Sequence, residues 1–84
     1  MIDVRVRRIV ADHGKLGVDV DTLSTDADLY EVGLTSFATV QLMLALEEEF
    51  DVEIPDRLLN RRTFQSIAAM SGAVGSLLQD RASA

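Results

Sequence analysis

Ser36 is the residue of this 84-residue chain whose type and position best suit covalent chemistry. It follows Gly33 by three positions and stands at the start of a strongly patterned helical stretch, SFATVQLMLALEEEF. A serine at a helix start usually serves as the N-cap. Thr35 could fill the cap instead, which would leave Ser36 at the first helical position with its hydroxyl in solvent. A phosphate ester there would be favoured by the helix dipole and the free N–H groups of the first turn, so the site suits a phosphorylated or phosphate-linked serine.

The other side chains give little support to catalysis or to metal binding. His13 is the single histidine, has no evident acidic partner for a triad, and suits the C-terminal end of a helix. The acidic stretches DVDTLSTDAD and EEEFDVE lack the spacing of a calcium-binding loop, and no glycine-rich phosphate loop is present. There are no cysteines, which excludes disulfides and cysteine zinc sites. We therefore predict no catalytic residue, no dedicated metal site and no enzyme.

Length and charge set further bounds. The length predicts a single domain over residues 1–84, and 48% hydrophobic residues are typical of a globular chain. No signal peptide is recognisable, and the longest uncharged run, residues 63–79, is too short to cross a membrane. The net charge is −6, and residues 16–56 hold eleven of the fourteen acids and none of the eight bases. We expect a soluble, cytoplasmic monomer that binds neither nucleic acid nor membrane and attracts basic partner surfaces, although the charge could simply keep the domain soluble.

The apolar pattern predicts an all-α four-helix bundle with a short third helix and a long loop between the first two helices. Helices are expected over residues 2–13 and 36–50, and a third of one or two turns in residues 56–62 after Pro55 breaks the chain. Thr63 is expected to cap the last helix. The loop, residues 14–35, should lie on the core through eight apolar side chains: Leu16, Val18, Val20, Leu23, Leu29, Tyr30, Val32 and Leu34.

The helix over residues 36–50 separates into two faces at 100° per residue. One face, expected in the core, holds Leu42, Met43, Leu46 and Phe50. The opposite face holds Phe37, Gln41, Leu44 and Glu48, and large apolar residues beside acids are typical of a docking surface. The alternative is that the long loop covers Phe37 and Leu44.

The stretch DLYEVGLTSFATVQLMLALEEEFDVEIPD resembles acyl carrier proteins and peptidyl carrier proteins. The resemblance implies a four-helix bundle in which Ser36 receives 4′-phosphopantetheine from coenzyme A, whose thiol would explain the missing cysteine. It implies a phosphopantetheinyl transferase, an acyl- or amino acid-activating ligase and a downstream transferase or synthase with a basic docking surface as partners. These would dock on the second helix, at Thr35, Phe37, Gln41, Leu44, Glu47 and Glu48, and we expect both Glu47 and Glu48 to be exposed.

Departures from the usual pattern of the family point to a specialised carrier. The aspartate that precedes the serine in the family is Thr35 here, and two positions that are often acidic in fatty-acid carriers are Ala38 and Gln41. The run Thr39–Leu42 is similar to D-alanyl carrier proteins, so an aminoacyl or small acyl cargo is favoured. The alternatives are a carrier for fatty-acid or polyketide synthesis and, from a different class, a helical interaction module that carries nothing.

Overall fold

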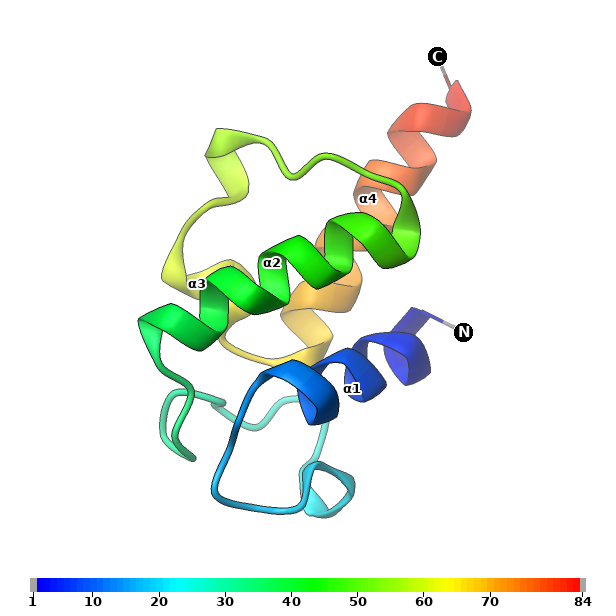
Figure 1. Ribbon diagram of the computed structural model, residues 1–84. Coiled ribbons are helices and arrows are strands. Elements are labelled where there is room, and N and C mark those ends of the chain that lie inside the picture. Colours follow the sequence, from blue (N-terminus) through cyan, green and yellow to red (C-terminus); the bar gives the residue numbers. More distant parts are fainter. Residues whose placement is uncertain (1, 84) are drawn as a thin grey trace.

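Four helices and two short 3-10 turns make up the regular structure of this protein, seen in a computed structural model that describes residues 2–83 (Figure 1). No strand occurs in these residues, and the predicted all-α four-helix bundle with a short third helix and a long first loop is confirmed. None of its helices is both long enough and apolar enough to cross a membrane, within that part of the chain. The elements are α1 (Ile2–His13), η1 (Val20–Thr22), α2 (Ser36–Phe50), η2 (Asp56–Leu58), α3 (Arg61–Phe64) and α4 (Ile67–Ser83).

The core lies between α1, α2 and α4. Helix α1 packs on both α2 and α4, and α3 packs on the start of α4. The C-terminal turns of α4 extend beyond the other helices (Figure 1). Burial of these apolar side chains, at roughly 25 cal/mol per Å², is the main stabilising term in a domain of this size. The side chains with almost no exposed surface are Val6, Val10, Leu29, Leu42, Leu46, Ile67, Met70 and Val74.

The long loop is held in place by α1 and by the residues that join α3 to α4. The Arg7 guanidinium donates from Nη1 to the carbonyl oxygens of Val20, at 2.6 Å, and Leu23, at 2.9 Å. The N–H of Leu29 donates to the Gln65 carbonyl at 2.8 Å. Most of the loop's apolar side chains reach the core as predicted, but the prediction for Val18 is wrong, since this residue is exposed. The loop is therefore an ordered part of the fold that fixes where α2 begins.

The boundaries around α3 differ from the prediction. Thr63 does not cap the last helix; it is buried inside α3, whose cap is Asn60, with Oδ1 accepting from the Thr63 N–H at 3.1 Å. Helix α4 starts at Ile67, after Ser66 accepts from the Ala69 N–H at 3.0 Å. Several polar residues in this stretch could cap a helix, and only the packing of the short third helix selects among them.

Candidate functional site

Ser36 occupies the first helical position of α2 and does not cap it. The cap is Thr35, which has extended backbone angles and whose Oγ1 accepts from the Ala38 N–H at 3.0 Å. The prediction of Ser36 as the N-cap is thus wrong, and the alternative arrangement is confirmed. Ser36 is exposed, and its hydroxyl makes no hydrogen bond with any residue in 2–83. An unbonded hydroxyl beside the positive end of a 15-residue helix fits a covalently attached phosphate group.

The turn before α2 explains why Ser36 faces outward. Gly33 has φ +114°, a conformation that residues with a side chain rarely adopt. The next residue, Leu34, is buried, and its N–H donates to the Leu29 carbonyl at 3.0 Å. With Leu34 fixed in the core, the chain turns outward at Thr35, and the cap then starts the helix with Ser36 on the surface.

An open cleft of about 480 Å³ lies between α2 and α3, with Ser36 in its wall. Val40 and Met43 of α2 face it, although Met43 was predicted to be in the core and is only partly buried. Within the described residues the lining contains one cationic side chain and no carboxylate. The full lining is Tyr30, Ser36, Thr39, Val40, Met43, Leu59, Asn60, Arg61 and Phe64.

Three elements meet around this cleft through Tyr30, Thr39 and Arg61. The Arg61 guanidinium carbon lies 3.9 Å from the centroid of the Tyr30 ring, and the Tyr30 hydroxyl lies 3.4 Å from Thr39 Oγ1. Stacking on a tyrosine face is a preferred arrangement for arginine. No local pattern in the sequence predicts this contact, because Tyr30 lies on the long loop and Arg61 begins α3, and their relative position depends on the whole fold.

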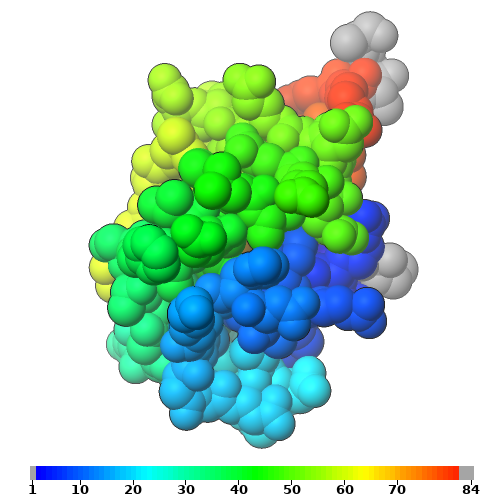
Figure 2. All heavy atoms as spheres, in the orientation of Figure 1, coloured from blue at the N-terminus to red at the C-terminus, as the bar shows by residue number. Residues whose placement is uncertain are grey.

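The predicted docking face of α2 is exposed. Phe37 retains 68% of its accessible surface and Leu44 retains 50%, so the alternative that the loop covers them is wrong. Val40, at 49%, adds a third apolar side chain that the sequence analysis did not include. Gln41 is partly buried and Glu48 is exposed. In the space-filling view α2 crosses the middle of the visible face, above α1 (Figure 2).

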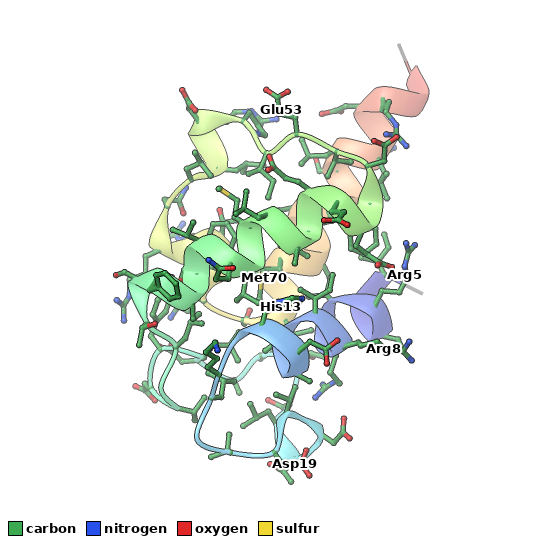
Figure 3. The ribbon with its side chains drawn as sticks, in the orientation of Figure 1. Arg5, Arg8, His13, Asp19, Glu53 and Met70 are labelled. Atoms are coloured by element: carbon green, nitrogen blue, oxygen red, sulfur yellow. The ribbon has the colours of Figure 1, made fainter. Side chains whose placement is uncertain are left out.

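The three consecutive glutamates of α2 have different environments. Glu47 is partly buried, and its Oε2 accepts from the Ile54 N–H at 2.9 Å, so the prediction that it is exposed is wrong. Glu49 of α2 pairs with Arg5 of α1 at 2.8 Å. Figure 3 labels Arg5 on α1. Among residues 2–83 only Glu48 of the three has no such partner. Glu48 is therefore the one glutamate of these three whose carboxylate is unpaired within the described residues.

A second groove, of about 620 Å³, runs between α1 and α2. Its α2 side includes Gln41, Leu44 and Glu48, and its α1 side includes Arg8 and His13, both labelled in Figure 3. His13 is the last residue of α1, as predicted. It lines this groove, whereas Ser36 lines the α2–α3 cleft, so the structure does not bring the two together.

Comparison with known proteins gives one family and several close relatives. Residues 5–73 match the family described as "Phosphopantetheine attachment site". An aminoacyl carrier protein of Agrobacterium fabrum (strain C58) is 48% identical over 83 residues, which cover 99% of this chain and 100% of that protein.

Two solved structures place relatives of this chain on a ligase. One is a carrier protein from Agrobacterium tumefaciens bound to an engineered Bradyrhizobium japonicum glycine:carrier protein ligase and ATP. It is 51% identical, covers 89% of this chain and 97% of its own, and superposes with a TM-score of 0.86. The other is the glycylated carrier protein bound to the Bradyrhizobium japonicum ligase. It is 28% identical, covers 86% and 96% of the two chains, and has a TM-score of 0.74.

Proposed function

The chain belongs to the phosphopantetheine attachment site family of carrier proteins, and from this membership we propose that Ser36 is the residue that bears the 4′-phosphopantetheine. The observation that carries the proposal is the free, exposed hydroxyl of Ser36 next to a threonine that already caps the helix. A serine engaged in capping would have to break a hydrogen bond before it could react, and Ser36 has none to break.

For this attachment α2 provides the acceptor hydroxyl and the positive end of a helix. The Ser36 Oγ forms a bond to the phosphorus of coenzyme A that carries the pantetheine, and the pyrophosphate P–O bond to that phosphorus breaks. 3′,5′-ADP leaves, and the proton of the Ser36 hydroxyl passes to a base supplied by the transferase. The attached group supplies a terminal thiol, which holds cargo as a thioester. The positive end of α2 stabilises the phosphodiester anion next to it. In this proposal the protein carries out no reaction itself and is not an enzyme.

The proposed cargo is an amino acid, held as an aminoacyl thioester. Support comes from the aminoacyl carrier protein that is 48% identical to this chain, and from the related carrier proteins seen on a glycine:carrier protein ligase. The same relatives favour this cargo over a fatty-acid or polyketide intermediate. The predicted single domain and cytoplasmic location, and the monomeric state, are parts of the same proposal.

The proposed partners are a phosphopantetheinyl transferase, an ATP-dependent amino acid ligase and a downstream transferase or synthase. We place their docking on the exposed face of α2, at Phe37, Leu44 and Glu48, with Gln41 between them. Thr35 and Glu47, also predicted from the sequence to contact partners, have hydrogen bonds within the fold and are assigned a supporting role.

The attachment is tested by intact mass after incubation with coenzyme A and a broad-specificity phosphopantetheinyl transferase. The wild type is expected to gain one phosphopantetheine, and so is Thr35→Ala, whereas Ser36→Ala is expected to gain nothing. Attachment to Ser36→Ala, or no attachment to the folded wild type with several transferases, would refute the assignment.

The cargo and the docking face are tested on the resulting holo protein. Incubation with the Bradyrhizobium japonicum glycine:carrier protein ligase, glycine and ATP is expected to add one glycyl group. Phe37→Ala is expected to raise the KM of that reaction because it removes the largest exposed apolar side chain on α2. Val18→Ala, an exposed valine on the long loop, serves as the control and should leave KM unchanged. Equal KM values for the two variants would place docking elsewhere.

A further inference from the structure

We propose that Arg61 is a positioning residue for the phosphodiester at Ser36, and that it holds the first part of the attached arm over the α2–α3 cleft. This inference rests on the proposed attachment at Ser36. It starts from the fact that Ser36 and Arg61 line the same cleft, from two elements that are separate in the chain.

The charges of the side chains that line the cleft identify Arg61 as the partner for an anion at Ser36. Of the side chains that line it in the described structure, Arg61 alone is cationic and none is a carboxylate, so an anion placed at Ser36 meets no opposing acid. The first turn of α2 also lacks an acidic residue. Attachment would bring a permanent negative charge to this position, and a nearby guanidinium is the most favourable partner for it.

Apart from Ser36 itself, the other polar side chains of the cleft already take part in hydrogen bonds within the fold. The amide of Asn60 caps α3 through Oδ1 and donates from Nδ2 to the Arg57 carbonyl at 3.1 Å. Thr39 Oγ1 donates to the Thr35 carbonyl at 2.8 Å and lies near the Tyr30 hydroxyl. Arg61 differs from these residues, because its stacking on Tyr30 involves only the face of the guanidinium.

Stacking leaves the edge of the guanidinium available. The five N–H donors of arginine lie in the plane of the group, and no hydrogen bond uses those of Arg61 within residues 2–83. A planar fork of donors suits two phosphate oxygens at once. The ring of Tyr30 limits the orientations of the guanidinium, which lowers the entropy lost when the phosphodiester is bound. Tyr30 therefore orients the guanidinium of Arg61, and this guanidinium binds the phosphodiester anion.

Arg62 provides a matched control. It is the next residue of the same short helix and has the same charge and a similarly exposed side chain, but it does not line the cleft. Substitution of either arginine by glutamine removes one positive charge from α3. A difference between Arg61→Gln and Arg62→Gln therefore reports position and not net charge.

The test is NMR on the apo and holo forms of the full chain. On conversion of the wild type from apo to holo, we expect the Arg61 Nε–Hε resonance to shift and the Arg62 resonance to stay in place. In the holo form, the ³¹P resonance of Arg61→Gln should move toward the value of urea-unfolded holo protein. That of Arg62→Gln should stay at the wild-type value, and Arg61→Lys, which keeps the charge but loses the planar fork, should fall between.

Salt provides an independent check. At about 1 M salt the Debye length is about 3 Å, so the ³¹P difference between wild type and Arg61→Gln should shrink. An unchanged Arg61 resonance on attachment, or the same ³¹P shift in both glutamine variants, would overturn the inference. If Arg61→Gln does not fold, the apo-to-holo comparison of the wild type still decides. Intact mass keeps the two proposals separate: no attachment to wild type refutes the role of Ser36, whereas attachment without the NMR changes refutes only the role of Arg61.

Discussion

Thr35 caps α2 and Ser36 does not, so substitutions at these two adjacent residues should affect different properties. We expect Thr35→Ala to lower stability and Ser36→Ala to abolish modification. Thr35 accepts a hydrogen bond from the Ala38 N–H at 3.0 Å and is exposed, so Thr35→Ala removes the cap and little packing. Loss of a threonine cap lowers the free energy of unfolding by about 1 kcal/mol, within a range of about 0.5–2 kcal/mol. For a domain of this size, 1 kcal/mol corresponds to a decrease in Tm of roughly 4–8 °C.

Ser36→Ala should behave in the opposite way. The Ser36 hydroxyl makes no hydrogen bond among residues 2–83, and alanine is the better helix former. The free energy of unfolding should therefore be unchanged or rise by up to about 0.5 kcal/mol. Under the alternative in which Ser36 is a plain cap in a protein that carries nothing, the same change would lower it by about 0.5–2 kcal/mol.

The assay is urea unfolding of the apo proteins, followed by circular dichroism at 222 nm. Thr35→Ser keeps a capping hydroxyl and serves as the control, with stability close to that of the wild type. Comparing m values shows whether the unfolded states remain alike. A loss of about 1 kcal/mol in Ser36→Ala together with none in Thr35→Ala would refute the assignment of the cap.

Three further comparisons test other parts of the structure. Glu47→Ala should lower the free energy of unfolding by about 1–3 kcal/mol, because the Ile54 N–H loses its acceptor. Glu48→Lys should leave the free energy of unfolding within about 0.5 kcal/mol of the wild type and raise the KM of the ligase reaction. Urea unfolding and loading kinetics measure the two effects, and equal losses of stability in the two variants would contradict the distinction. Arg7→Gln should lower the free energy of unfolding by roughly 1.5–3 kcal/mol and speed amide hydrogen exchange in residues 16–34, because two loop carbonyls lose a charged donor. Unchanged hydrogen exchange in these residues would show that the loop is held by its apolar contacts alone. A propionyl thioester on the holo protein should shift the NMR resonances of the α2–α3 cleft more than a glycyl thioester of the same size. The glycyl ammonium is disfavoured in this cleft, because the lining presents the positive charge of Arg61 and no carboxylate. Larger shifts with the glycyl thioester would refute this.

The main helices, their buried faces and the choice of Ser36 could be predicted from the sequence, because each depends on residues close together in the chain. The spacing of Val6, Ile9 and Val10 predicted α1, and that of Leu42, Leu46 and Phe50 predicted the length and buried face of α2. Side-chain periodicity also predicted the exposure of Phe37 and Leu44, since residues on opposite faces of one helix cannot all be buried in so small a bundle. The choice of Ser36 came from its position at a helix start, together with a run of residues that resembles a family of carriers.

Contacts between distant segments were decided only by the tertiary structure. Helical spacing placed Glu47 on the surface, but the chain beyond α2 turns back and presents the Ile54 N–H to it. The sequence favoured Ser36 over Thr35 as the cap, and the cap is Thr35 because the buried Leu34 sets the direction in which the chain enters α2. The stacking of Arg61 on Tyr30 and the cleft they share with Ser36 depend on how the long loop and α3 pack around α2. Short-range patterns encode helices and their faces, whereas a hydrogen bond or a cleft between remote residues exists only after the whole core has set their positions.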